Sequence, residues 1–327
     1  MKLRGRQAFC VFLFALILCG AAETAHARAA DQYVTWGIEL EDCSEALNEY
    51  LNNELRIFLD KINSWDKEYT GEQVTLDFLF SLRRYFHSSR LKKWLRNSPK
   101  VDRYPDNDVS WWEYQKMSIY RRMSFPYVMP IARTIRVGDV YLGIDKIGHF
   151  VRYGHAYFRT YRDLLEDGLG KSEAVERVLR LGVKQERFFL GGLVCGVFSY
   201  ADLEANYRGF CLARDMCEGD DPYLEYEHGM WKLARPIDIR DYVTPGFDES
   251  YNNSRYWFFR WRKVKPVLED EYCPKLELPA VEKRFECYEE IDRESLAHRL
   301  AAQYFEKHGE KPQQAQNIKT ICRECEN

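Results

Sequence analysis

The stretch from residue 144 to residue 162 concentrates side chains that can do chemistry. At about 100° per residue on a helix, Asp145, His149, Arg152 and Arg159 fall within about 80° of one another. The opposite side is apolar and carries Ile144, Ile147, Val151 and Phe158. One face therefore offers a carboxylate and an imidazole, which suit a metal ion or proton transfer, and two guanidiniums, which suit an anion. An ordinary solvated helix with Asp145 as its N-cap has the same pattern, and His155 lies off this face.

Glu186 stands on the apolar side of the next predicted helix. The positions that share its face are Val175, Leu179, Val183, Leu190, Leu193 and Val197. A carboxyl group in such a stripe must be protonated, paired or bound to a cation. This environment is typical of acids, bases and metal ligands, and equally of structural ion pairs. The uncharged run of residues 188–201 that follows predicts a core helix too short to span a bilayer.

The segment from Ser199 to Gly209 offers a further carboxylate. Ser199 and Asp202 have the spacing of a capping box, with Asp202 in the place of the usual Glu. Asp202 and Asn206 share a helix face at i and i+4, the spacing that two ligands or a catalytic pair would use. Both interpretations stay open for Asp202.

Taken in order, these motifs resemble the pattern of VanZ-like proteins and related bacterial envelope proteins. The resemblance covers about 65 residues and rests on Asp145-Lys146-x-x-His149-Phe150, an isolated Glu186, and Asp202-x-x-x-Asn206-x-x-Gly209. It implies that one site contains Asp145, Lys146, His149, Glu186, Asp202 and Asn206. The chain departs from that family in its predicted N-terminal signal peptide. Its helices around the motifs are also too charged or too short to span a membrane.

The first functional hypothesis is a hydrolase or transferase of the cell envelope. Glu186, Asp202 and His149 are its candidate catalytic residues. Asp145, His149 and Asp202 are candidate ligands of a divalent metal, and mixed imidazole and oxygen donors fit zinc or manganese. Lys146, Arg152 and Asn206 are the candidate substrate-binding residues, and the two cations suit an anionic, phosphorylated substrate.

The second hypothesis is a non-catalytic structural or binding protein of the envelope. In that case the polar residues hold helices together, and function lies on the C-terminal surface. The segment of residues 251–261 is aromatic enough to contact a carbohydrate or a protein, and the same composition also suits a core segment. A serine nucleophile has no Gly-x-Ser-x-Gly frame around Ser199, and the Gly168–Ser172 stretch lacks a complete phosphate-binding loop.

The N-terminus predicts secretion across the inner membrane to the periplasm or cell envelope. Three basic residues precede an uncharged run at 8–22, and small residues at 25, 27 and 29 follow, as in a signal peptide spanning residues 1–29. An uncleaved anchor is the alternative interpretation. Cys19 follows Leu18, where a lipoprotein would carry a small residue.

The charge of the chain limits the classes of partner that we expect. Its 327 residues carry a net charge of −3, and removal of residues 1–29 would leave −6. Such a charge argues against a nucleic-acid partner. After cleavage we expect no integral membrane segment. An anionic envelope component or a carbohydrate is the expected partner.

Eight of the ten cysteines lie beyond the signal peptide, an even number that predicts disulfides in a secreted chain. Cys211 with Cys217 and Cys273 with Cys287 are the easiest local closures. The terminal Cys322 and Cys325 could form a structural disulfide, a redox pair or half of a zinc site.

The elements that must position these residues are mainly helices. Helix-period patterns cover 42–62, 74–95, 144–166, 172–198, 200–212, 254–264 and 293–307, and the segment 131–143 predicts a β-hairpin around Gly138-Asp139. The fold class is mainly α, with this one small hairpin. We expect residues 30–327 to form a single domain, with the motifs in 131–212 and a loop-rich, disulfide-braced part in 213–327.

Overall fold

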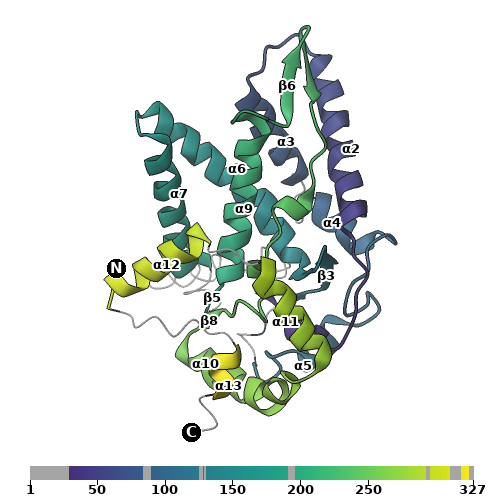
Figure 1. The fold of residues 1–327 in the computed structure, drawn as a ribbon, viewed down its shortest axis with the longest axis vertical. Helices are drawn as coiled ribbons and strands as arrows, with labels where there is room; N and C mark the ends of the chain where they lie inside the picture. Colours follow the sequence, from purple (N-terminus) through teal and green to yellow (C-terminus); the bar gives the residue numbers. More distant parts are fainter. Residues whose placement is uncertain are drawn as a thin grey trace, which may run out of the picture.

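The computed structural model describes residues 29–83, 90–124, 128, 130–190, 196–291, 295–309 and 318–323, and these residues form a mainly helical fold (Figure 1). Of the predicted signal peptide, Ala29 alone is among the described residues. Cys195 and Cys325 also lie outside the described residues. The helices are α2 Ser44–Asn63, α3 Gly71–Arg83, α4 Arg90–Asn97, α5 Trp111–Met117, α6 Ile144–Glu166, α7 Lys171–Gln185, α9 Tyr200–Cys217, α10 Phe258–Val267, α11 Pro279–Ile291, α12 Leu296–Lys307 and α13 Ile318–Arg323.

The strands form small two-stranded sheets. The parallel pair joins β1 Ala29–Ala30 to β2 Ile131–Ala132, and the antiparallel pairs are β3 Thr134–Val137 with β4 Val140–Gly143, β5 Val197–Phe198 with β8 Arg255–Tyr256, and β6 Leu224–Glu227 with β7 Met230–Leu233. The predicted hairpin is confirmed as β3 and β4. Gly138 has a φ of 59° in its turn, a conformation that glycine adopts without strain. The hairpin of β6 and β7 was not predicted.

Of the four long helix predictions from residue 42 to residue 198, two agree with the structure and two do not. The predicted helix at 144–166 is confirmed residue for residue as α6, and the prediction at 42–62 corresponds to α2. The single stretch at 74–95 is two helices, α3 and α4. The predicted helix at 172–198 is too long, because α7 ends at Gln185 and is followed by a π-helical turn at Glu186–Leu190 and by β5.

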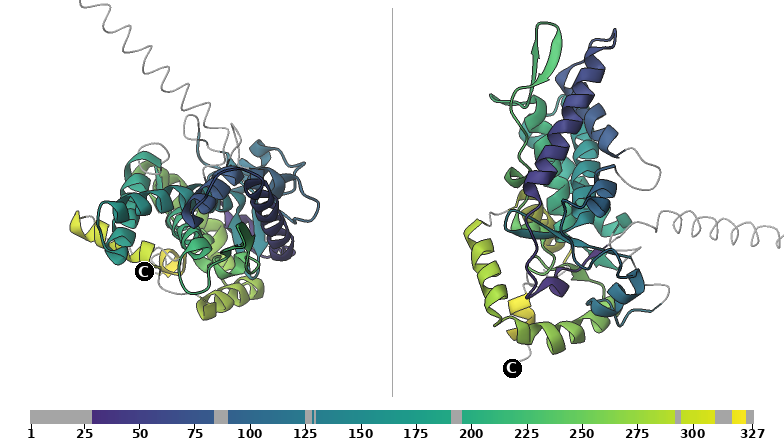
Figure 2. Two further views of the ribbon diagram at one scale, coloured as in Figure 1. Left: turned by 90° about the horizontal axis from the view of Figure 1, so that it is seen from above. Right: turned by 90° about the vertical axis from the view of Figure 1, so that its right-hand side faces the viewer.

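The centre of the molecule is the pair of α6 and α9 (Figure 1). Their backbones approach closely because each helix carries a glycine at the crossing. A Cβ atom added to Gly154 would lie 2.6 Å from the carbonyl oxygen of Gly209, and one added to Gly209 would overlap the carbonyl oxygen of Phe150. The helices α3, α4 and α7 pack against α6, and α12 packs against α7 and α9. Figure 2 shows the same helices from two further sides.

The disulfide of the structure links Cys273 to Cys322 and holds α13 against the segment before α11. The predicted pairing of Cys273 with Cys287 is therefore wrong, and Cys322 does not pair with its neighbour Cys325. Cys211 and Cys217 are both free. Six residues apart on α9, they are separated by about 9 Å along the helix axis, beyond the reach of a disulfide.

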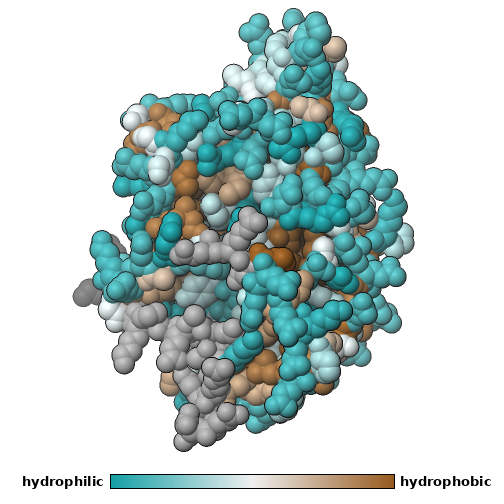
Figure 3. All heavy atoms as spheres, viewed as in Figure 1, coloured by the Kyte–Doolittle hydropathy of each residue, from teal (hydrophilic) through white to brown (hydrophobic). Residues whose placement is uncertain are grey.

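Most of the molecular face in Figure 3 is hydrophilic, with small hydrophobic patches between polar side chains. Within the part of the chain that the structure describes, no helix combines the length and the apolar character that a membrane crossing requires.

The glycine crossing gives a test of the fold. We expect Gly209→Ala to lower the free energy of unfolding by about 1–3 kcal/mol, because the added methyl group forces the two helices apart. Gly170→Ala is the matched control: a Cβ atom there meets no atom within 4 Å. The free energy of unfolding of this control should change by no more than about 1 kcal/mol. Urea unfolding followed by circular dichroism measures both, and equal stability of the two variants would contradict the close crossing.

Candidate functional site: a buried lysine among carboxylates

The ammonium group of Lys146 is the centre of the candidate site. Its Nζ atom lies 3.0 Å from Asp145 Oδ2, 2.6 Å from Asp202 Oδ1 and 2.5 Å from Glu249 Oε1. The Lys146 side chain is fully buried. Burial alone would lower the pKa of this amine, but the three carboxylates raise it well above its usual value. Lys146 is therefore a buried, charged ammonium.

Three elements bring these groups together. Asp145 and Lys146 lie in the first turn of α6, which follows β4 directly with Gly143 as its N-cap. Asp202 lies in the first turn of α9, where Ser199 is the N-cap and accepts a hydrogen bond from the Asp202 N–H. Asp145 is not an N-cap, so that alternative from the sequence is wrong. The cap at Ser199 is confirmed, and it leaves the Asp202 carboxylate free to bind Lys146.

Glu249 comes from the segment that follows the short turn Pro245–Phe247. Its backbone N–H donates to Gln32 Oε1 at 2.9 Å, and its Oε1 atom accepts a hydrogen bond from the Ser199 hydroxyl at 3.2 Å. The neighbouring Asp248 accepts hydrogen bonds from the hydroxyls of Ser250 and Tyr288. These bonds fix the segment, and with it the Glu249 carboxyl group beside Lys146.

Burial and the Lys146 charge act in opposite directions on the pKa values of the surrounding carboxyl groups. Burial raises the pKa of Glu249 to about 7, although Lys146 opposes the shift. For Asp145 burial also favours the proton, but the adjacent Lys146 ammonium outweighs it and the pKa is lowered. The cluster thus contains a carboxyl group that exchanges its proton near neutral pH.

Glu186 is buried, as its place in the apolar stripe predicts, with 2% of its surface exposed. One carboxyl oxygen accepts a hydrogen bond from the Ser199 N–H at 3.2 Å. The other oxygen has no hydrogen-bond partner among the described residues. Burial and the nearby charge of Asp202 raise its pKa well above the usual value. Glu186 is therefore a buried carboxyl group that holds its proton more strongly than an exposed glutamate does.

His149 connects the cluster to the surface, since its side chain is 21% exposed. Its Nε2 atom lies 3.5 Å from Asp202 Oδ2, the carboxylate oxygen that Lys146 does not bind. Its Nδ1 atom lies 3.2 Å from Asn206 Oδ1, and the Asn206 amide also donates to the Tyr157 hydroxyl. Burial lowers the pKa of His149 below its usual 6.5. The imidazole is therefore neutral at pH 7.

Asp145, Asp202 and Glu249 could hold a metal ion, because each offers a carboxylate oxygen within 4.8 Å of the others. His149 is not part of this group of three. One oxygen each of Asp145 and Glu249 lacks a hydrogen-bond partner among the described residues. The Lys146 ammonium is bonded to all three carboxylates, so a metal ion there would have to displace it.

The remaining predicted residues lie around this cluster. Arg152 is exposed beside Tyr153, and Arg159 is exposed about two turns further along α6. His155 is half-buried next to Phe80, apart from the Lys146 carboxylates. The aromatic segment 251–261 is partly packed inside the molecule: Tyr256 is buried and stacks on Trp261, while Phe258 is exposed.

Sequence reasoning missed Glu249 and Lys92. Glu249 stands in a segment without helical or strand period, so no pattern distinguished it. Lys92 is buried on the apolar side of α4 with Leu91 and Leu95, and burial lowers its pKa to about 8. Its place among apolar positions is the same kind of signal that identified Glu186.

Comparison with protein-family models, with curated proteins and with solved structures finds no match to this chain. The resemblance to VanZ-like proteins stays a prediction.

Removal of the central ammonium tests the cluster directly. We expect Lys146→Met to lower the free energy of unfolding at pH 7 by about 3–5 kcal/mol, because three buried carboxylates lose their cation. Lys100→Met removes a lysine whose side chain is 60% exposed, and should cost about 1 kcal/mol or less. Adding Asp202→Asn to Lys146→Met should recover part of the loss. A loss within the range of the Lys100 control would contradict the central role of Lys146.

The raised pKa values predict how stability depends on pH. Burial raises the pKa of both Glu249 and Asp31 to about 7. The folded state therefore keeps protons that the unfolded state releases above about pH 4–5, and stability falls as pH rises from about 5 to 7. Glu249→Gln should flatten this slope, whereas Glu290→Gln, at an exposed position, should not. Urea unfolding at pH 5, 6 and 7 measures the pH dependence of the free energy of unfolding. A stability that rises over this range would contradict the raised pKa values of Glu249 and Asp31.

Proposed function

We propose that the protein is an acid/base hydrolase or transferase of the bacterial cell envelope that acts on an anionic substrate. His149 is the group that reaches the substrate, and Asp202 is its partner. The observation that carries the proposal is the contact of the partly exposed His149 imidazole with a carboxylate whose other oxygen is bound to a buried ammonium.

This arrangement suits proton transfer. The neutral imidazole carries its one proton on Nδ1, which faces the Asn206 amide oxygen, so its basic lone pair is on Nε2. There it can accept a proton from a nucleophile, such as water, that attacks the substrate. The imidazolium that forms is stabilised by the Asp202 carboxylate at Nε2, and Asn206 orients the ring at Nδ1. Lys146 holds Asp202 in place, so Lys146 is a positioning residue and does not bind the substrate.

Positive charge near His149 supports an anionic substrate. Arg152 is one turn after His149 on α6, and its side chain is exposed. Burial and the nearby Arg152 charge lower the pKa of Arg83 at the end of α3, which places two guanidiniums close together. In this proposal Arg152 binds the substrate, and Glu186 and Glu249 are the buried acids that store protons behind it.

The N-terminal sequence and the Cys273–Cys322 disulfide support a location outside the cytoplasm, because disulfides persist in oxidising compartments. We propose export by a signal peptide at residues 1–29 and a function in the periplasm or cell envelope, related to that of VanZ-like proteins.

A divalent cation is the second candidate, favoured by the three carboxylate oxygens of Asp145, Asp202 and Glu249. An all-oxygen donor set suits manganese better than zinc. The ion would supply Lewis acidity and neutralise the carboxylates that Lys146 now binds. If neither proposal holds, the cluster is a structural link between α6, α9 and the Glu249 segment, as in the non-catalytic hypothesis.

Activity measurements with two histidine variants test the proposal. The probes are 4-nitrophenyl acetate and bis(4-nitrophenyl) phosphate, which report acyl and phosphoryl transfer. We expect His149→Gln to reduce the rate by about 10²–10⁴-fold. His155→Gln, on the same helix but outside the cluster, should change it less than threefold. The rate of the unmodified protein should fall as pH drops below 6.5, where His149 takes up a proton.

Circular dichroism and thermal unfolding serve as the control that both variants are folded. Absence of turnover of either probe by the unmodified protein, or equal activity of the two histidine variants, would contradict the enzymatic proposal. Metal-dependent activity that survives His149→Gln would favour the second candidate.

A further inference from the structure

A pocket lies where the end of α2 meets the hairpin of β6 and β7, segments found at the upper end of the molecule in Figure 1. It is remote from the Lys146 cluster. Asp202 and Cys217 mark the two ends of α9, about 22 Å apart along the helix axis, and the pocket belongs to the Cys217 end. There a Cβ atom added to Gly71 would lie within 3.5 Å of both Cys217 and Trp231.

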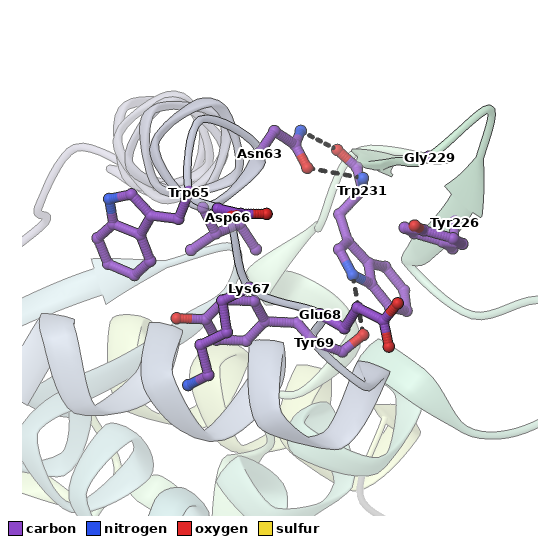
Figure 4. A pocket seen from close by; sticks show the side chains of 10 residues that line it. Asn63, Trp65, Asp66, Lys67, Glu68, Tyr69, Tyr226, Gly229 and Trp231 are labelled. Atoms are coloured by element: carbon purple, nitrogen blue, oxygen red, sulfur yellow. Dashed lines mark hydrogen bonds between the residues drawn. The ribbon is translucent and has the colours of Figure 1, made fainter.

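The pocket is a cavity of about 270 Å³ between two chain segments (Figure 4). The residues that line it are Ile62, Asn63, Trp65, Asp66, Lys67, Glu68, Tyr69, Tyr226, Gly229 and Trp231. Asn63 fixes the hairpin to α2, because its side chain accepts from the Trp231 N–H and donates to the Trp231 carbonyl, both at 2.8 Å. The Trp231 indole N–H donates to the Tyr69 carbonyl at 3.3 Å. The pocket is therefore preformed.

Aromatic rings provide its apolar surface. Tyr226 and Trp231 are directly opposite on β6 and β7, so they lie on one face of the hairpin, with ring centroids 5.1 Å apart. Trp65 and Tyr69 form a second tilted pair, at 6.1 Å. Tyr226 is 57% exposed and Trp65 45% exposed, so parts of both rings are accessible to a ligand.

Charged side chains provide hydrogen-bonding groups beside these rings. Asp66 and Glu68 have no ion-pair partner in the part of the chain that the structure describes, so their carboxylates are available as acceptors. Lys67 Nζ lies 4.3 Å from the centre of the Tyr69 ring. This internal cation already covers that ring, which argues against a pocket for a cationic ligand. The two carboxylates argue against an anionic one.

From these groups we infer that the pocket binds a neutral saccharide, one or two pyranose rings at a time. A pyranose offers C–H groups on its faces, which suit the rings of Tyr226 and Trp231, and hydroxyls at its edges, which suit Asp66, Lys67 and Glu68. The volume is just below the roughly 300–1,000 Å³ of pockets for drug-sized ligands, as a short sugar requires. This inference is independent of the proposed reaction at His149.

Titration calorimetry of the purified protein with cellotriose, maltotriose and the trisaccharide of N-acetylglucosamine tests the inference. At least one should bind with a Kd of about 1 mM or tighter. Tyr226→Ala should weaken that binding at least tenfold, and Glu68→Gln should weaken it as well. Met230→Ala is the matched control: Met230 is 55% exposed on the same hairpin but pairs with Glu227 on the opposite face. It should change the Kd less than twofold.

Thermal unfolding separates loss of binding from loss of structure, since Tyr226→Ala removes a largely exposed ring. Co-sedimentation with peptidoglycan sacculi distinguishes a wall glycan, which would retain the protein, from a free sugar, which would not. The inference is overturned if none of the three trisaccharides binds, if choline binds in their place, or if the Tyr226 and Met230 variants bind the sugar equally.

Discussion

A charged ammonium without access to water must be surrounded by acceptors, and much of the central structure meets this requirement for Lys146. Isolated burial of such a charge would cost many kcal/mol. The three carboxylates around Lys146 offset that cost, and none of them belongs to the same turn of chain as the other two. The first turn of α6, the first turn of α9 and the Glu249 segment must therefore be in place together.

The packing of α6 against α9 places the Asp202 carboxylate beside Lys146. Gly154 and Gly209 let α6 and α9 approach until their backbones touch, and the same closeness brings the N-terminal turns of both helices to one point. Burial, together with the negative charge of neighbouring carboxylates such as Asp202, raises the pKa of Glu249 and Glu186. His149 lies at the edge of the cluster, where its partly exposed ring contacts Asp202.

The sequence predicted what depends on local period. The amphipathic pattern of α6 extends over six turns and identified the helix bounds, and Glu186 was recognised because a charge interrupted an apolar stripe. Glu249 gave no signal, since its role depends on a contact with Lys146 across 103 positions of the chain. The disulfide of Cys273 was mispredicted for the same reason: its partner Cys322 is brought near by the packing of α13, which spacing does not reveal.

A crystal structure determined after soaking in manganese, with anomalous diffraction recorded, tests the central claim most directly. We expect density for the Lys146 ammonium within hydrogen-bond distance of Asp145, Asp202 and Glu249, with no anomalous peak among them. An anomalous peak between the three carboxylates, with the Lys146 side chain turned away, would contradict the account. It would show that the cation the site is built for is a metal ion.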